Sequence, residues 1–227
     1  MKVDLVVQII RNPTGPLIGD LAHRLLCEFL EGRPLADIQP LLAVPRTQDA
    51  ACWILTEIGE SARLFVLEVA PLLSSPRWQV RVGAVDFVLS WATSVHGDAL
   101  ARATLLLEDD NVRVRWRCAR LLLTCAPEQL RAAAEAFPRI QHRTDCHVLV
   151  DYLIRNVSEQ ATLHHLARES SRVLRLCAMM LAFRNRWPRE LVLELASIAG
   201  DEEVTKLADD ALHRRLVAEG DERRGNV

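Results

Sequence analysis

One short stretch of the chain carries the residue types of a transition-metal site. His142, Cys146 and His147 lie close together, with Asp145 between them. Ligands four positions apart, such as His142 and Cys146, could share one face of a helix. However, Thr144 or Asp145 stands where a helix would begin, which would place His142 before it. Because no CxxC pair or second ligand pair is visible, we expect ordinary helix and turn residues here, and no metal.

Motifs of catalysis are also missing from the sequence. His164 and His165 are adjacent, so on a helix they would point to different sides. We find no glycine-rich phosphate loop, no nucleophile elbow, and no Ser-His-Asp or Cys-His arrangement recognisable from spacing. The sequence therefore predicts a protein that is not an enzyme and that needs no cofactor.

Three arginines on one predicted helix are the most distinctive polar residues. Arg113, Arg117 and Arg120 step by four and three residues, which places them on one stripe of a largely apolar helix. That stripe is the only polar side of the helix, so we expect it to face solvent. Guanidinium groups pair with carboxylates in two-pronged geometry, so the stripe suits an acidic protein surface. The alternative is a solvated face that is neutralised by aspartates of the same chain, such as Asp86.

The helix that carries these arginines belongs to a repeat. Val80-Arg81 has a small residue four positions and a leucine nine positions after the valine, and Val114-Arg115 repeats this pattern 34 residues later. Weaker copies lie at residues 50–55, 145–157, 174–178 and 201–211. Arg81, Arg115 and Arg175 hold the same place in their copies. We expect their guanidinium groups to bond to neighbouring turns.

Proline, glycine and acidic clusters divide the chain into about twelve or thirteen short segments with helical periodicity. We expect helices to stop at prolines such as Pro127 and Pro138. An N-cap needs a side-chain oxygen that accepts a hydrogen bond from the first turn. Five residues stand where such a cap is expected: Ser61, Asp98, Asn111, Ser158 and Asp201.

A first helix, a short turn, and a second helix that opens with Val-Arg followed by a small residue resemble the HEAT repeat. The best copies are Ser75–Ala84 and Asp109–Ala119, and the resemblance spans roughly residues 35–218. It implies an all-α fold, a right-handed superhelical α-solenoid of about five or six helical hairpins. Second helices of HEAT proteins line a concave face that usually binds another macromolecule. HEAT-like proteins that bind iron use His-Glu pairs, and this chain has none.

The resemblance also divides the chain. We expect one domain over residues 1–218, with N-terminal capping helices at 1–34 and repeats at 35–218. A frayed polar tail would follow at 219–227.

Shifting the arginine stripe by the repeat spacing predicts the floor of the concave face. The partner-binding residues expected there are Arg113, Arg117, Arg120, Asp86, Ser90, Asp151 and Arg184. The same shift also places less polar residues on the floor, namely Cys52, Gly83, Val173, Cys177, Met180 and Leu207, with Arg214 at its end. By contrast, Trp53, Phe87 and Leu121 share a phase that predicts a core row, and most of the five tryptophans have core phase.

Composition and charge limit the classes of partner. Half of the residues are apolar but only 5% are aromatic, which is typical of packed helices. The net charge of −2 offers no general attraction to nucleic acid or to acidic membranes. The N-terminus does not resemble a signal peptide, and no apolar run reaches the length of a membrane span. We expect a cytoplasmic protein with six reduced cysteines, of which Cys118 and Cys177 are shielded.

Together these observations predict a non-catalytic scaffold, adaptor or inhibitor that binds one protein through its concave face and is a monomer without that partner. A bacterial toxin-neutralising immunity protein is one such role. The alternative is a nucleic-acid-binding or DNA base-repair protein, because the chain is similar in length and helical composition to HEAT-like alkylpurine DNA glycosylases. Aspartates such as Asp86 and Asp151 on the predicted floor would repel phosphates, so nucleic acid is the weaker expectation.

Overall fold

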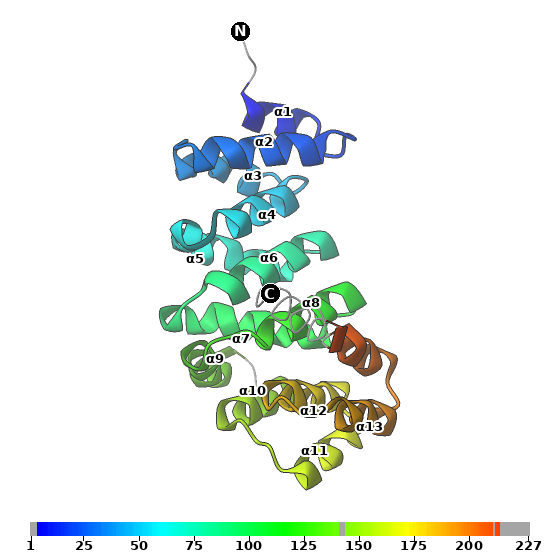
Figure 1. Ribbon diagram of the computed structural model, residues 1–227. Coiled ribbons are helices and arrows are strands. Elements are labelled where there is room, and N and C mark those ends of the chain that lie inside the picture. The colour runs from blue at the N-terminus through cyan, green and yellow to red at the C-terminus, as the bar shows by residue number, and fades with distance from the viewer. Residues whose placement is uncertain (1–3, 141–143, 211, 214–227) are drawn as a thin grey trace, which may run out of the picture.

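The computed structural model in Figure 1 describes residues 4–140, 144–210 and 212–213 of the 227-residue chain. Within these ranges every regular element is a helix, and no strand occurs. The predicted all-α class is therefore confirmed. The expected tail at 219–227 and the floor position at Arg214 lie outside the described residues.

The chain forms thirteen α-helices with well-defined bounds over the described ranges. In the first half these are α1 (Leu5–Arg11), α2 (Ile18–Leu30), α3 (Gln39–Ala43), α4 (Gln48–Ile58), α5 (Val66–Val69), α6 (Trp78–Trp91) and α7 (Gly97–Leu105). In the second half they are α8 (Val112–Leu122), α9 (Pro127–Ile140), α10 (Asp145–Arg155), α11 (Gln160–Ala167), α12 (Arg172–Arg184) and α13 (Arg189–Ala199).

Short 3-10 helices join several of these elements. They are η1 (Leu35–Ile38), η2 (Gly59–Phe65), η3 (Ala70–Ser74), η4 (Ser94–His96) and η5 (Leu106–Glu108). Residues 202–210 are also helical, and this stretch is called the C-terminal segment below.

The helix ends only partly follow the predicted signals. Asn111 accepts a hydrogen bond from the Arg113 backbone N–H at 2.9 Å, and Asp201 caps the C-terminal segment by accepting from the N–H of Glu203 at 2.9 Å. The other three predicted caps are wrong, because Ser61 lies within η2, Asp98 lies within α7, and the N-cap residue of α11 is Glu159, which follows Ser158. The expected stop at Pro138 is also wrong, since α9 continues through it to Ile140.

An arginine joins the elements at the N-terminal end. The Arg33 guanidinium donates to Glu28 at 2.7 Å, to Asp4 at 2.8 Å and to Asp37 at 2.9 Å. Asp4 caps α1, Glu28 lies on α2 and Asp37 lies on η1. One half-buried cation therefore links three consecutive elements of the region expected to cap the chain.

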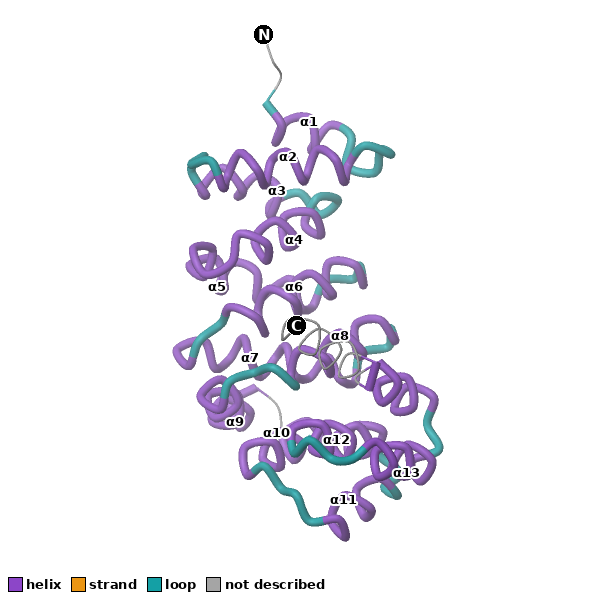
Figure 2. The backbone as a smooth tube through the Cα atoms, in the orientation of Figure 1, coloured by secondary structure: helices purple, strands orange, loops and turns teal. Residues whose placement is uncertain are grey.

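Helices α2, α4, α6 and α8 pack in succession, and α7 packs on α9 beside them. Figures 1 and 2 show this as a row of helices that runs from the N-terminus down to α8. The packing of α4 on α6 is close at Gly83, where an added Cβ would lie 2.8 Å from the Cβ of Cys52. Both residues are therefore helix–helix contacts, and the prediction that they form part of an open floor is wrong.

The row changes direction after α8. Among the described helices, α10 packs on α9 and α12, whereas α8 packs mainly on α6 and η5. Helices α11, α12 and α13 then pack on one another, and the C-terminal segment returns to lie beside α8 (Figure 1). Residues separated by almost ninety positions in sequence therefore become neighbours.

Two of the recurring arginines, Arg81 and Arg175, join neighbouring elements of the fold. The Arg81 guanidinium donates to the Ser75 carbonyl at 2.7 Å and to both carboxylate oxygens of Asp109, in the turn before α8. Arg175 bonds in the same way to the Glu169 carbonyl and to Asp201. The expectation that these arginines bond to neighbouring turns is confirmed for both.

Arg115 follows the pattern in its bonds to backbone carbonyls, but not in its carboxylate partner. Its guanidinium donates to the backbone carbonyls of Asp109 and Asp110, as its repeat position predicts. Its carboxylate partner is Glu203 of the C-terminal segment, 88 residues away, to which it donates from both Nε and Nη2. The Arg115–Glu203 pair therefore joins the C-terminal segment to α8.

The predicted core row is partly wrong. Phe87 is fully buried and Leu121 packs partly buried against the core, but the Trp53 side chain is 39% exposed. Because α4 meets α6 through Cys52, the next residue lies about 100° around the helix and points away from that contact. In the described part of the chain, no helix combines the length and apolar character needed to cross a membrane.

Candidate functional site

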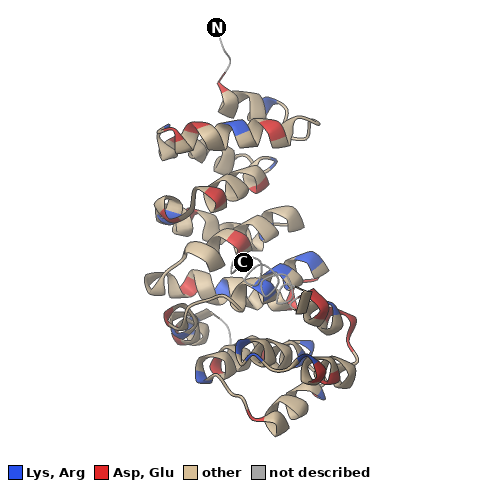
Figure 3. Cartoon of the chain, viewed as in Figure 1, with Lys and Arg blue, Asp and Glu red and all other residues tan. Residues whose placement is uncertain are grey.

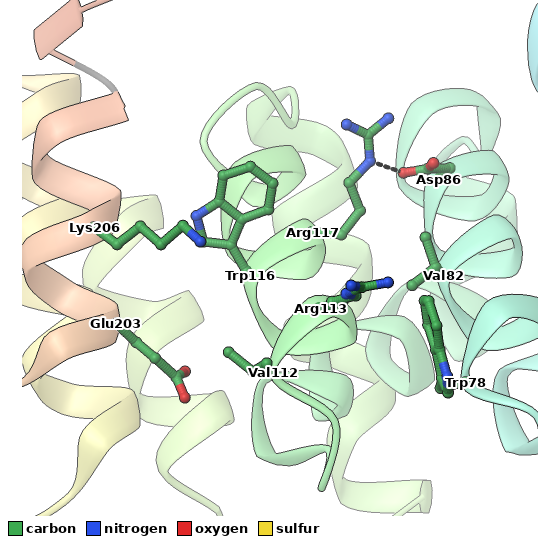
Figure 4. A pocket seen from close by; sticks show the side chains of 9 residues that line it. All are labelled: Trp78, Val82, Asp86, Val112, Arg113, Trp116, Arg117, Glu203 and Lys206. Carbon is green, nitrogen blue, oxygen red and sulfur yellow. Dashed lines mark hydrogen bonds and ion pairs between the residues drawn. The ribbon is translucent and has the colours of Figure 1, made fainter.

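A cavity of about 520 Å³ lies between α6, α8 and the C-terminal segment. Figure 4 shows its lining, which is Trp78, Val82, Asp86, Val112, Arg113, Trp116, Arg117, Glu203 and Lys206. Its size is in the range of sites that hold a small molecule or a few side chains of a partner. Figure 3 shows basic residues on α8 near acidic residues of the C-terminal segment.

The structure brings three of the predicted site residues together in this cavity: Asp86, Arg113 and Arg117. Arg117 donates from Nε to Asp86 Oδ1, as the dashed line in Figure 4 marks. Burial raises the pKa of the Asp86 carboxyl above its ordinary value, and the bond from Arg117 offsets only part of this effect. The interpretation of the stripe as neutralised within the chain therefore holds for Arg117.

Two other cations of the cavity lie on indole rings. The Arg113 guanidinium carbon is 4.9 Å from the ring centroid of Trp78, and Lys206 Nζ is 5.8 Å from that of Trp116. Arg120, also on the predicted stripe, lies over Trp116 at 4.5 Å but does not line the cavity. Attraction to an aromatic face orients a cation without neutralising its charge.

The carboxylates and cations of the lining are not evenly matched. Asp86 is paired with Arg117, and Glu203 is shared by Arg115 and by Arg172 at 3.1 Å. By contrast, Arg113 and Lys206 have no carboxylate partner among the residues that the structure describes. The cavity therefore presents two cations whose charge an incoming anion could neutralise.

The remaining predicted site residues lie elsewhere. Ser90 is exposed near the end of α6, and Asp151 on α10 lies 4.0 Å from His147. Arg184 is half-buried at the end of α12, near Cys125. None of these three lines the cavity. The grouping of Asp151 and Arg184 with Arg113 assumed one unbroken series of second helices, whereas the row changes direction after α8. Ser90 lies at the far end of α6 from Trp78.

The predicted floor is closed along much of its length. Val173, Cys177, Met180 and Leu207 are all buried, so the prediction that they face a partner is wrong. On α12 and the C-terminal segment, the face that corresponds to the arginine stripe of α8 packs into the hydrophobic core. The cavity lies on the part of the floor between α6 and α8, where charged, aromatic and valine side chains line it.

Sequence reasoning missed the two tryptophans of the site. Trp78 and Trp116 were expected among core residues, but both are only half-buried and line the cavity. The repeat contains a signal that could have found them. Val112 stands 34 residues after Trp78, and Trp116 stands 34 residues after Val82. Each of these two repeat positions is therefore a tryptophan on one of the helices α6 and α8 and a valine on the other.

The candidate metal residues do not form a site within the described ranges. Cys146 is fully buried, and the His147 ring stacks on Phe137 with centroids 5.1 Å apart. His142 lies outside the described residues. Over the described positions, no group of three or more His, Cys, Asp or Glu side chains could hold a metal ion.

The cysteines are all free thiols, and the predicted shielding of Cys118 and Cys177 is confirmed, since both are fully buried. Burial raises the pKa of both thiols well above the ordinary value. No nucleophilic thiolate is therefore built at these positions.

Comparisons with known proteins do not supply a family for this chain. No family model matches it, and a search of curated proteins found none that is similar in sequence. The functional argument therefore depends on the cavity and its residues.

Proposed function

We propose that the protein is a non-catalytic scaffold, adaptor or inhibitor that binds one partner protein at the face formed by α6, α8 and the C-terminal segment. In this proposal the helical row is a HEAT-like α-solenoid, and the cavity is the centre of its binding face. The observation that supports it best is the pair of uncompensated cations, Arg113 and Lys206, each held on a tryptophan. Tryptophan and arginine are the residues that most often dominate the energy of protein interfaces.

Charge favours a protein over a nucleic acid as the partner. A nucleic acid presents a regular series of phosphates and requires a continuous basic groove. Here two separate cations of the lining, Arg113 and Lys206, lack a carboxylate partner among the described residues, which is not a continuous basic groove, and the chain carries a net charge of −2. The indoles could stack on bases, so single-stranded nucleic acid is the competing ligand that the experiment includes.

The biological role follows from what the partner is. A toxin-neutralising immunity protein would bind a toxin at this face, and an adaptor would bind a component of a larger assembly. We propose a cytoplasmic monomer, in which the six free thiols stay reduced.

The test is recovery of the partner from the native host with the wild-type protein as bait, followed by calorimetry with the purified partner. Replacing Arg113 with Ala should weaken the complex by about 1 to 3 kcal/mol if the arginine pairs with a buried carboxylate. The matched control is Arg102→Ala, because Arg102 is an exposed arginine on α7 outside the cavity; this variant should leave affinity unchanged. Equal affinity of the Arg113→Ala variant and the wild type would contradict the proposed face.

A further inference from the structure

The cavity has an apolar centre between two separate cation–indole pairs. Arg113 on α8 lies on Trp78 of α6, and Lys206 of the C-terminal segment lies on Trp116 of α8. Between these pairs lies Val112, which is 48% exposed, and Val82 lies beside Trp78 on α6 (Figure 4). A ligand that fills this space meets an apolar surface in the middle and a cation toward either side.

The two carboxylates of the lining do not oppose an anionic ligand strongly. Asp86 is bonded to Arg117, and Glu203 is bonded to two arginines, Arg115 and Arg172. Their charges are offset within the protein, so the field that a ligand experiences is set by Arg113 and Lys206. Because each of these cations already lies on a ring, little side-chain entropy is lost when a carboxylate pairs with it.

We propose that the cavity binds a short acidic segment of the partner protein, in which an aromatic or aliphatic side chain stands between two acidic residues. The apolar side chain packs on Val112 between the two indoles. One flanking carboxylate pairs with Arg113 and the other with Lys206. This inference rests on the proposed function and adds the chemistry of the partner to it.

The selective features are the two charges and the apolar group together. A purely acidic segment would leave the valines and indoles in contact with water, and a purely apolar one would cover two cations without pairing them. A neutral segment of the same shape should therefore bind more weakly than the acidic one, and so should a segment that lacks the apolar residue.

The experiment starts from a phage library of random 12-residue peptides selected on the full-length protein. Selected sequences should be enriched in Asp or Glu on both sides of an aromatic or aliphatic residue. A labelled peptide carrying Glu-Phe-Glu is then compared with matched Gln-Phe-Gln and Glu-Ser-Glu peptides by fluorescence anisotropy. We expect each replacement to weaken binding by about 5-fold or more, and higher salt to weaken only the acidic peptides.

Variants of the protein connect the binding to the cavity. Arg113→Ala and Lys206→Ala should each weaken binding of the Glu-Phe-Glu peptide by about 5-fold or more, and the double variant by more than either. Both residues are exposed, so the thermal transition should be unchanged. Arg102→Ala is again the control. Tryptophan emission should change on binding, and Trp116→Phe should remove much of that change.

Several results would overturn the inference. In the phage selection, these are enrichment of neutral or basic peptides, or no enrichment at all by the folded protein. In the binding measurements, they are acidic peptides that bind Arg113→Ala and Lys206→Ala as tightly as wild type. In competition, it is displacement of the peptide by oligothymidine at equal or lower concentration. The pull-down of the native partner is independent of these results. A partner that needs Arg113 but carries no acidic segment would leave the proposed function standing and the inference refuted.

Discussion

Arginine has two distinct roles in this protein, and the difference lies in what the guanidinium group meets. Arg81 and Arg175 donate both to a backbone carbonyl about six residues earlier and to an aspartate in a following turn, so they join consecutive elements. Arg113 meets the face of Trp78 and no carboxylate of the described chain. The first kind of arginine is paired with a carboxylate within the fold, and the second is available to a ligand.

Thiol reactivity should follow burial at the scale of single residues. Cys27 is partly exposed, whereas the other five cysteines are buried. Burial also raises the pKa of Cys125 to about 12, which keeps its thiol protonated and unreactive. In native protein we expect one thiol to react quickly with Ellman's reagent, and the other five to react at least about 100-fold more slowly.

The control is Cys27→Ser, which should remove the fast phase alone, and all six thiols should react in denaturant without reductant. Fast labelling of Cys118 or Cys177 in the native protein would contradict the burial seen here.

Two aspartates should respond to pH in opposite directions. Burial raises the pKa of Asp86 above its ordinary value of 3.8, so folding favours the protonated carboxyl. For Asp201, burial acts in the same direction, but bonds from Arg175 and from two backbone N–H groups lower the pKa overall. The stability that Asp86 contributes is therefore present at low pH, and it is lost as the pH rises above the ordinary pKa of an aspartate. The stability that Asp201 contributes is present at pH values above that ordinary pKa, and it is lost as the pH falls below it.

Chemical denaturation of the wild type, Asp86→Asn and Asp201→Asn between about pH 2.5 and pH 7 tests this pair. The stability of the wild type relative to Asp86→Asn should fall as pH rises, and relative to Asp201→Asn it should rise. The same slope for both variants would show that one of the two shifts has the wrong sign.

At the scale of elements, the close packing of α4 on α6 depends on a residue with no side chain. Gly83 faces the Cβ of Cys52, which is the base of a side chain and cannot rotate away. Alanine normally stabilises a helix interior by about 1 kcal/mol relative to glycine. At this position the added methyl group would push the two helices apart.

We expect Gly83→Ala to lower the free energy of unfolding by about 1 to 3 kcal/mol, as overpacking of a close contact does. Gly19 on α2 provides the matched control, because an added Cβ there meets nothing within 4 Å. Gly19→Ala should be neutral or stabilising by up to about 1 kcal/mol. Urea denaturation of both variants measures the difference, and a stabilising Gly83→Ala would show that α4 and α6 are not in close contact.

For the whole molecule, the decisive feature is the return of the C-terminal segment to α8. A stack in which each repeat touches only its neighbours has no contacts between distant parts of the chain. Here Val204, Leu207 and Ala208 are buried, and the Arg115–Glu203 pair ties their segment to α8. The bond to Glu203 keeps the pKa of Arg115 above its ordinary value, so this guanidinium group is charged at neutral pH. The cavity exists because of this return.

Replacing Arg115 with Ala should therefore loosen a segment far away in sequence. The side chains of Arg115 and Glu203 are 10% and 20% exposed, and removing one partner of so buried a pair should cost about 2 to 4 kcal/mol. Hydrogen exchange should speed up in residues 202–210. Arg81→Ala is the matched control, since its partner Asp109 lies in the adjacent turn. It should destabilise the protein without a selective effect on residues 202–210, and unchanged exchange there in Arg115→Ala would refute the link.

Local features of the fold could be read from the sequence because they depend on neighbouring residues. The period of apolar residues predicts helices throughout, and the 34-residue recurrence of Val-Arg predicts the bonding of Arg81 and the solvent-facing side of α8. The small set Asp86, Arg113 and Arg117 was predicted for the same reason. Adjacent repeats pack on one another, so residues about one repeat apart meet between α6 and α8, as Arg113 meets Trp78 and Arg117 meets Asp86.

The tertiary structure alone decided which helix α8 meets on its other side. By repeat position, the partner of Arg115 should lie in the turn before α10, but the carboxylate that reaches it is Glu203. Periodicity shows which face of a helix is apolar, but many apolar faces are alike. Which of them pack together depends on the free energy of the whole arrangement. For that reason Lys206, the second uncompensated cation of the cavity, could not be assigned to the site from its sequence.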